Sequence, residues 1–234
     1  MKKRIWELDA LRGMTILLMV AVHLIYDLVY VFDVYTIEGP SLFQFLRDWG
    51  GIIFLVLSGI CVTLGSHPIR RGILVFSCGM LISAVTLGMY RFGFADADIV
   101  IYFGVLHLLG ICMILWPLLR KIPTFALPII GASMIAGGLY LVSHVRTQSL
   151  LGVPFGIPCY GFLTSDYFPL LPNLGYFLIG VMLGRLFYKN RQSLLPALDG
   201  KSIVIRFFCL CGRQSLWIYM LHQPALYLIL FLIL

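Results

Sequence analysis

Long apolar runs, separated by short polar segments, dominate this chain. Seven of them are long enough to cross a bilayer, since a membrane-spanning helix needs roughly 20 mostly apolar residues at about 1.5 Å of rise each. These runs cover residues 13–32, 49–65, 72–90, 99–119, 124–143, 172–188 and 214–234. The pattern therefore predicts an all-α, polytopic transmembrane helical bundle of about seven spans.

Composition agrees with a membrane protein. Of the 234 residues, 61% are hydrophobic and 12% are charged, which is about half the charged share of an average soluble domain. A water-soluble enzyme and a disordered chain are therefore excluded. No linker rich in Pro, Gly or Ser and no internal repeat divides residues 1–234, so we expect a single domain. The first run lacks a small-residue cleavage site behind it, so we expect no removable signal peptide.

The basic residues predict how the spans are oriented. With the N-terminus in the cytoplasm, 14 of the 17 Lys and Arg residues fall on the inner side, and only Arg47, Arg91 and Arg146 fall outside. This asymmetry follows the positive-inside rule and predicts an N-in, C-out arrangement. The net charge of +7 is then explained by topology, so no nucleic-acid partner is expected. The inner set comprises Lys2, Lys3, Arg4, Arg12, Arg70, Arg71, Arg120, Lys121, Arg185, Lys189, Arg191, Lys201, Arg206 and Arg213.

Ionisable side chains inside the predicted spans are the main candidates for function, because each costs roughly 2.5 to 3.5 kcal/mol to insert. Arg12 and His23 are eleven residues apart, close to three helical turns, so both point the same way, with His23 near mid-membrane. Asp27 follows His23 by four residues. At that spacing its carboxylate could fix the tautomer of the imidazole and raise its basicity. The alternative for Asp27 is a position at the outer membrane interface.

Two further histidines are predicted to lie at the depth of His23. His107 comes some eight residues after its span enters from outside, and His222 about eight residues after its span leaves the inside, which places each roughly 12 Å deep. Three separate helices would thus offer an imidazole in one middle layer. The alternative for both is a hydrogen bond that ties helices together. Their order along the chain carries no metal-ligand spacing, so no metal is predicted.

Basic pairs on the predicted inner side are candidates for binding an anionic cofactor. Arg70 and Arg71 form one pair, and Arg120 and Lys121 form the other. Paired basic groups could clamp a phosphate. The alternative is that they only set the topology and contact lipid phosphates. Arg185, assigned to the same side, joins this candidate set.

The longest connection, about residues 144–171, lies on the predicted outer side and is rich in Pro and Gly. A long loop of this kind is often a lid or a wall of a site. Asp166 and Tyr167 in this loop are candidates to meet a polar substrate. Their alternative is a Pro-flanked turn or a helix cap.

Several strings along the chain, taken in order, resemble a known family. They look like the small bacterial membrane proteins related to the catalytic domain of heparan-alpha-glucosaminide N-acetyltransferase. The resemblance runs from about residue 6 to residue 224, and the spacing of Arg12 and His23 also resembles the first-helix motif of wider membrane acyltransferases. The strings are Glu7-Leu-Asp-Ala-Leu-Arg-Gly13 leading to His23, Phe54-Leu-Val-Leu-Ser-Gly59, Arg70-Arg-Gly72, Phe103-Gly-Val-Leu-His107, Ser165-Asp-Tyr-Phe-Pro-Leu-Leu-Pro172, Gly184-Arg185 and Ser215-Leu-Trp-Ile-Tyr-Met-Leu-His-Gln-Pro224.

This resemblance implies an integral membrane acyltransferase. Such an enzyme moves an acyl group, usually acetyl from cytoplasmic acetyl-CoA, to a hydroxyl or amine on the far side, here a glycan-type acceptor. By the same analogy His23 is the catalytic histidine and Arg12 its motif partner. His23 could act as general base or as nucleophile, with Asp27 orienting it and His107 or His222 stabilising an oxyanion. The bacterial cytoplasmic membrane is the expected location, and the sequence leaves a homodimer open.

Two other classes of function remain at this stage. One is a small proton-coupled transporter or channel that uses the same histidines and Asp27 as a relay. Transporters usually have internal repeats or paired broken helices, and neither is found in this sequence. The other is a non-catalytic membrane scaffold, in which the histidines only join helices.

Overall fold

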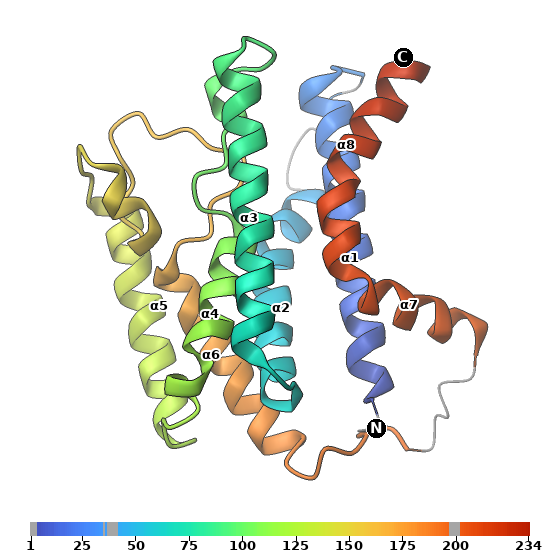
Figure 1. The fold of residues 1–234 in the computed structure, drawn as a ribbon, viewed down its shortest axis with the longest axis vertical. Helices are drawn as coiled ribbons and strands as arrows, with labels where there is room; N and C mark the ends of the chain where they lie inside the picture. Colours follow the sequence, from blue (N-terminus) through green and yellow to red (C-terminus); the bar gives the residue numbers. More distant parts are fainter. Residues whose placement is uncertain (1–3, 35, 37–41, 197–201) are drawn as a thin grey trace. The chain divides into compact units, whose positions relative to one another are not determined.

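The computed structural model describes residues 4–34, 36, 42–196 and 202–234. Lys2, Lys3 and Lys201 of the predicted inner basic set lie outside the described residues. Within the described part the chain is helical, as predicted, and only isolated β-bridges are found. The elements, shown in Figure 1, are α1 (Trp6–Tyr26), the π-helix η1 (Asp27–Val31), α2 (Leu42–Leu64), α3 (Pro68–Arg91), η2 (Ala97–Ile99), α4 (Val105–Leu119), α5 (Ala126–His144), η3 (Leu150–Phe155), α6 (Leu170–Phe187), α7 (Ile203–Arg213) and α8 (Ser215–Ile233).

The predicted number of spans is confirmed. Six helices in the described part of the chain are long and apolar enough to cross a membrane: Trp6–Val31, α2, α3, α5, α6 and α8. The shorter apolar helix α4 brings the number to about seven. The protein is thus an integral membrane protein. Its N-in, C-out orientation stays a prediction.

The fourth span begins six residues later than predicted. Residues 99–104 are apolar but not part of α4. Their backbone groups bond instead to other segments: Val100 O accepts from Thr164 Oγ1 at 2.6 Å, and Phe103 O accepts from Phe168 N at 2.9 Å. The apolar run therefore combines an extended segment, held by the outer loop, with a helix of 15 residues.

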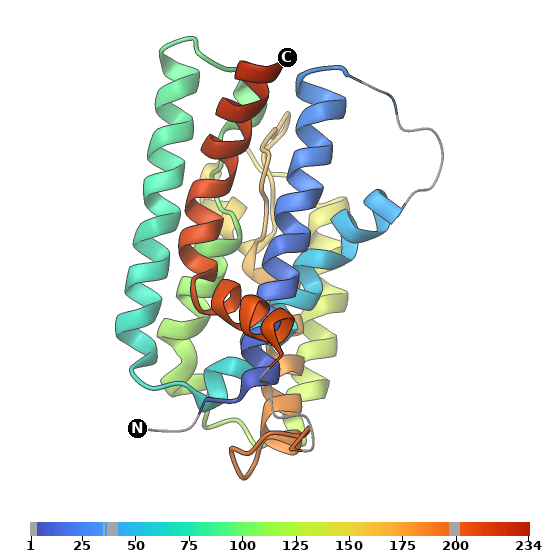
Figure 2. The ribbon, with the colours of Figure 1, turned by 90° about the vertical axis from the view of Figure 1, so that its right-hand side faces the viewer.

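The helices group into two compact units. The first contains the residues up to Leu57 and those from Asn190 onward, and the second is Ser58–Lys189. The prediction of a single domain stays a prediction. In the first unit α1 packs against α7 and α8. Figures 1 and 2 both show α1 and α8 side by side, with α7 running at a wide angle to them.

α7 lies where the sequence analysis predicted only a connection. Its eleven residues are strongly amphipathic. Cys209 and Cys211 are buried within the protein, whereas the apolar side chains of Ile203, Phe207 and Leu210 are exposed. A run this short cannot cross a bilayer, so a search for long apolar runs does not find it. An amphipathic helix lying across spanning helices suits the membrane interface.

Two glycines allow the backbones of α1 and α7 to touch. A Cβ atom on Gly13 would overlap the carbonyl oxygen of Phe208, and a Cβ atom on Gly212 would overlap the carbonyl oxygen of Asp9. Each glycine thus faces the backbone of the opposite helix. Small residues at such contacts let transmembrane helices approach closely, which increases van der Waals packing.

Acidic residues at the start of α1 fix the neighbouring segments. Glu7 is only 6% exposed, and its carboxylate accepts from Ser193 Oγ at 2.9 Å and from Leu194 N at 2.8 Å. Asp9 accepts from Arg213 Nε at 3.3 Å. The polar part of the string that begins at Glu7 therefore fixes the segment before α7 and the end of α7 against α1.

In the second unit the helices form two antiparallel pairs, α3 with α4 and α5 with α6, as both ribbon views show. The first pair is closely packed at two glycines of α3. Gly72 faces Ile114 and Gly79 faces His107 on α4. This register places the beginning of α3 beside the end of α4.

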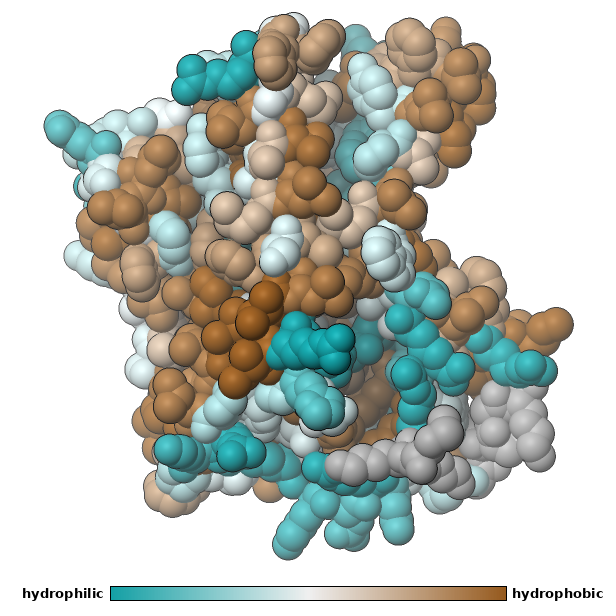
Figure 3. Space-filling model, in the orientation of Figure 1, coloured by the Kyte–Doolittle hydropathy of each residue, from teal (hydrophilic) through white to brown (hydrophobic). Residues whose placement is uncertain are grey.

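Apolar side chains cover the outward faces of the second unit. α3 exposes Ile73, Leu81 and Val85, and α5 exposes Ile129 and Leu139. Brown, hydrophobic side chains accordingly dominate these helices in Figure 3, whereas teal, hydrophilic side chains gather around the loops at their lower ends. Such outward faces fit contact with lipid acyl chains, because a helix already satisfies its own backbone polar groups.

Candidate active site

The first unit brings two of the predicted histidines together. His23 on α1 and His222 on α8 lie with their ring centroids 4.8 Å apart and their planes 83° to each other. Residues about 200 positions apart in the sequence thus meet edge to face. The contact forms where α1 and α8 pack against each other.

The hydrogen bond of His23 fixes which ring nitrogen can act as a base. Nδ1 lies 2.9 Å from the carbonyl oxygen of Met19. A carbonyl can only accept, so Nδ1 carries the proton and donates it. In the neutral ring, Nε2 then has the free lone pair. His23 is half-buried and has a defined tautomer.

Asp27 binds Gln223, a residue outside the set of candidates predicted from the sequence. Its side chain is completely buried, and both carboxylate oxygens accept from Gln223 Nε2, at 2.8 and 3.0 Å. The predicted orientation of His23 by Asp27 corresponds to no hydrogen bond here, since Met19 O holds the ring. Asp27 lies one turn after His23, and its carboxylate binds the amide of Gln223 rather than the imidazole.

Two buried acceptor atoms on α8 have no hydrogen-bond partner in the described structure. His222 donates Nδ1–H to Tyr219 O at 2.7 Å, so its Nε2 is an acceptor in the neutral ring. Gln223 directs its amide nitrogen to a carboxylate, so its Oε1 is also an acceptor. Both His222 Nε2 and Gln223 Oε1 are buried and unpaired in the described structure. An unsatisfied buried group typically costs about 1–3 kcal/mol. Because its Nδ1–H is already bonded to Tyr219 O, the neutral His222 ring has no further N–H to donate to an oxyanion.

Arg12 lies on the same unbroken helix as His23, as predicted. α1 is continuous from Trp6 to Tyr26, so the eleven-residue spacing corresponds to three turns in the structure. The Arg12 side chain is half-buried, one residue before the close contact at Gly13. Its role as motif partner of His23 stays a prediction.

His107 belongs to the second unit, and both of its ring nitrogens have partners. Nδ1 accepts from Gly104 N at 3.2 Å, and Nε2 lies 3.3 Å from Ser83 Oγ. The ring also stacks on Phe103, with centroids 5.4 Å apart. These contacts join α3 to the beginning of α4. Of the two alternatives for His107, they favour a hydrogen bond that ties helices together.

Asp166 in the outer loop contacts the beginning of α4. Its Oδ2 accepts from Val105 N at 3.2 Å. A Cβ atom on Gly104 would overlap the same carboxylate oxygen, so a larger residue there would displace Asp166 from this position. A carboxylate at the first turn of a helix stabilises it, because the unpaired N–H groups carry partial positive charge. The helix-cap alternative thus accounts for this contact of Asp166.

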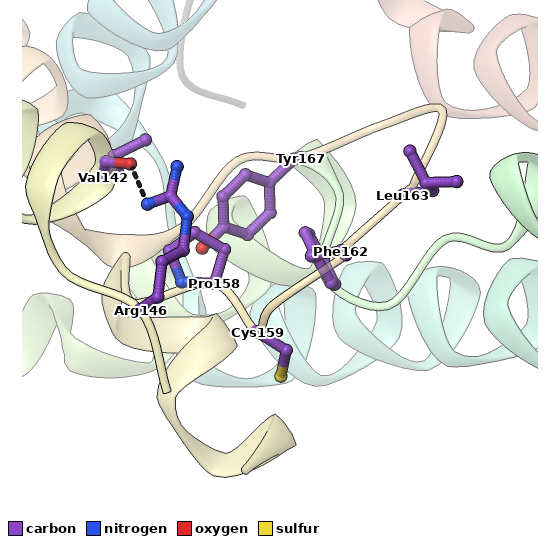
Figure 4. Close-up of a pocket in the computed structure, with 8 residues that line it drawn as sticks. Val142, Arg146, Pro158, Cys159, Phe162, Leu163 and Tyr167 are labelled. Carbon is purple, nitrogen blue, oxygen red and sulfur yellow. Dashed lines mark hydrogen bonds between the residues drawn. The ribbon is translucent and has the colours of Figure 1, made fainter. Parts of the chain in front are cut away.

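Tyr167 lines a pocket of about 290 Å³ in the second unit, on the predicted outer side. Figure 4 shows Arg146 and Tyr167 side by side in it. Arg146 Nη1 donates to Val142 O at 2.6 Å and to Val145 O at 3.0 Å. The guanidinium has no acidic partner among the described residues. The pocket is lined by Val142, Arg146, Pro158, Cys159, Gly161, Phe162, Leu163 and Tyr167.

Tyr167 is expected to ionise later than an ordinary tyrosine. Burial raises the pKa of its phenol from 10.0 to about 12, although the Arg146 charge opposes the shift. The neutral hydroxyl donates to Val153 O at 2.8 Å. Because the unfolded chain loses this proton first, the stabilisation is complete below pH 10 and is lost as pH rises toward 12.

Spectrophotometric titration of tyrosinate absorbance checks this expectation. Wild-type protein should show one more late-titrating tyrosine than the Tyr167→Phe variant, and its melting temperature should fall more steeply than that of the variant between pH 10 and 12. Tyr160→Phe is the matched control, because Tyr160 is 73% exposed in the same loop. Identical titration curves for wild type and Tyr167→Phe would contradict the assignment.

The second unit brings the predicted basic pairs to one end. Arg70 and Arg71 lie in the first turn of α3, and Arg120 and Lys121 directly follow α4. The antiparallel register of these helices puts both pairs at the same end. All four side chains are exposed. Phosphate groups bind favourably at such a place, because the helix N-terminus adds partial positive charge.

Arg185 supports the loop that carries one of these pairs. Its Nη1 donates to Ile122 O at 2.6 Å, its Nη2 donates to Arg120 O at 2.9 Å, and the guanidinium lies 5.9 Å from the centroid of the Trp116 ring. These bonds engage the side chain with the backbone on either side of Lys121. Binding of a cofactor by Arg185 stays a prediction.

A comparison with protein families decides which one the chain belongs to. Residues 4–224 match the family described as heparan-alpha-glucosaminide N-acetyltransferase, catalytic. The chain belongs to this family. The match covers α1 through the first half of α8, and so includes Arg12, His23 and His222. No match was found among curated proteins or among solved structures.

Membership of the heparan-alpha-glucosaminide N-acetyltransferase catalytic family indicates an acetyltransferase, and the long apolar helices indicate that it is a membrane protein. Three groups at its candidate sites were not singled out from the sequence: Gln223, the carbonyl of Met19 and Arg146. Gln223 could have been predicted from the sequence, since an amide inside an apolar span needs a hydrogen-bond partner.

Within the described residues, no three His, Cys, Asp or Glu side chains gather closely enough to hold a metal ion.

Proposed function

We propose that this chain transfers an acetyl group from acetyl-CoA to a hydroxyl or amine of an extracytoplasmic, glycan-type acceptor. The proposal depends most on one observation: Met19 O holds Nδ1 of His23 as a hydrogen-bond donor, which leaves the lone pair on Nε2 of a ring that contacts His222. A base or nucleophile needs this lone pair, and the membrane family supplies the reaction type.

His23 can act in two ways. As general base, Nε2 takes the proton of the acceptor hydroxyl or amine while that oxygen or nitrogen bonds to the acetyl carbon and the CoA thiolate leaves. As nucleophile, Nε2 itself bonds to the acetyl carbon and the thiolate leaves. The acceptor then takes the acetyl group from the ring, and its proton passes to the freed Nε2. In both cases Met19 O keeps the proton on Nδ1 and stabilises the positive charge that the ring acquires.

The basic end of the second unit suits the charged part of CoA. CoA carries several phosphates, and four basic side chains, Arg70, Arg71, Arg120 and Lys121, are exposed at this end. Arg185 would act through the loop that it holds rather than on the phosphates. When bound, acetyl-CoA supplies the activated acetyl group, and the chain supplies charge and orientation.

The outer-loop pocket suits part of a glycan acceptor. Its volume of about 290 Å³ is just below the usual range for ligand pockets, roughly 300–1,000 Å³, so it suits one small unit. Phe162 and Tyr167 present aromatic faces, with centroids 5.1 Å apart, and Arg146 adds a cation. Asp166 supports this wall by holding the start of α4.

Thermal stabilisation of the detergent-purified protein tests the donor. Acetyl-CoA and CoA should raise the melting temperature in a saturable way, whereas ATP, as a control for unspecific phosphate binding, should not. No shift at millimolar CoA would contradict the proposal and favour a transporter, which moves a substrate without consuming acetyl-CoA.

The Arg70→Gln, Arg71→Gln double variant is expected to weaken CoA binding roughly tenfold or more, because it removes charge-assisted hydrogen bonds to phosphate. The measurement is the CoA concentration at half-maximal thermal stabilisation. Arg91→Gln is the matched control, since Arg91 is an exposed arginine at the other end of the same helix. An unchanged CoA affinity in a folded double variant would exclude this basic end as the phosphate site.

A further inference from the structure

Two consecutive residues of α8, inside a membrane-spanning segment, each carry an unpaired acceptor. His222 Nε2 and Gln223 Oε1 are both buried, and neither has a partner in the described structure. Water is scarce at this depth, so a polar atom in such a place needs a partner from protein or ligand. The pair therefore indicates that a ligand supplies hydrogen-bond donors here.

The chemistry of these atoms defines the ligand group. Both are acceptors: Nδ1 of His222 is committed as donor to Tyr219 O, and the amide nitrogen of Gln223 is committed to Asp27. In the structure the amide nitrogen of Gln223, and not its oxygen, faces both carboxylate oxygens of Asp27. The site therefore suits neutral N–H or O–H groups and repels an anion.

We propose that His222 Nε2 and Gln223 Oε1 accept hydrogen bonds from the amide N–H groups of the pantetheine arm of CoA. This inference rests on the proposed function. The arm carries two amide N–H groups, and both need acceptors once the arm leaves water. The reacting hydroxyl or amine of the acceptor substrate is not the donor, because its proton goes to His23 Nε2.

The dimensions agree with this assignment. In acetyl-CoA, four covalent bonds separate the amide nitrogen nearest the sulfur from the thioester carbon, which is roughly 5 Å in an extended chain. The ring centroids of His23 and His222 are 4.8 Å apart. An arm bonded to His222 thus brings the thioester carbon to the neighbourhood of His23. His222 and Gln223 are positioning residues in this scheme, and His23 alone exchanges protons or acetyl.

Binding measurements with three probes test the inference. CoA, pantetheine and adenosine 3′,5′-bisphosphate represent the whole molecule, the arm and the nucleotide. His222→Phe keeps an aromatic ring against His23 but removes the acceptor. We expect it to weaken CoA and pantetheine roughly fivefold, the value of one neutral hydrogen bond, and to leave the bisphosphate unchanged. His144→Phe is the matched control, because His144 also donates Nδ1–H to a carbonyl one turn earlier.

A second variant protects the test against misfolding. Replacing Gln223 alone would leave Asp27 buried without a partner, so the double variant Asp27→Leu, Gln223→Met replaces both partners by apolar groups of similar size. It should weaken pantetheine binding as His222→Phe does. Equal affinity of wild type and both variants for CoA would overturn the inference. Failure of wild-type protein to bind CoA would overturn the inference and the proposed function together.

Discussion

Replacing His23 by asparagine is expected to lower acetyl transfer by roughly 10²- to 10⁴-fold, the usual contribution of a general acid–base group. The asparagine amide can still donate to Met19 O, as Nδ1 does now at 2.9 Å. It offers no basic nitrogen at the position of Nε2. The variant should therefore insert and fold like wild type while losing the reactive lone pair.

Release of the CoA thiol from acetyl-CoA measures this loss, with panels of amino sugars and of neutral sugars as acceptors. His144→Asn is the control, because His144 donates Nδ1–H to Tyr140 O at 3.1 Å in the same one-turn geometry. Its turnover should equal that of wild type. Near wild-type turnover by folded His23→Asn protein would exclude His23 as base or nucleophile.

Alanine at Gly13 or at Gly212 is expected to cost about 3 kcal/mol of stability each, at the upper end of the range for overpacking. A Cβ atom at either position overlaps a backbone carbonyl, that of Phe208 or of Asp9. Backbone atoms cannot rotate away as a side chain can, so α1 and α7 must move apart. Because α1 carries His23, the same substitutions should also reduce activity.

The melting temperature and the monodispersity of the purified variants in detergent measure this effect. Gly88→Ala is the matched control, since Gly88 lies in the helix α3 and a Cβ atom there would meet no other segment within 4 Å. Alanine there should be neutral, or stabilise by up to about 1 kcal/mol through helix propensity. Equal melting temperatures for Gly13→Ala and Gly88→Ala would contradict the packing of α1 on α7.

The sequence allowed the spans to be predicted, because the bilayer imposes a minimum length of apolar helix that is visible in any window. It did not allow α7 to be predicted, since an interfacial helix has no such minimum length. The start of α4 at Val105 was also not predicted, because residues 99–104 continue the same apolar run whether their backbone is extended or helical. Hydrogen bonds to the outer loop decide between these conformations.

At the candidate active site, the sequence predicted a common depth for His23 and His222, and the structure adds that their rings are in contact. Spacing alone gave a less accurate result for Asp27. Four residues of separation bring two side chains near each other, but a helical histidine always has a carbonyl one turn earlier, and here Met19 O takes the bond. Gln223 then pairs with Asp27, a contact between helices that local spacing cannot reveal.

Cys159 in the outer-loop pocket gives the chain a native reporter of its orientation. Its thiol is free and half-buried in the pocket, whereas Cys112, Cys209 and Cys211 are buried. The other two cysteines, Cys61 and Cys78, sit within the apolar helices α2 and α3. Cys159 should therefore be the one position that a charged maleimide labels, because this reagent does not cross bilayers. Labelling of intact cells would place residues 145–169 on the outer face of the membrane, whereas labelling only of opened cells would place them on the inner face.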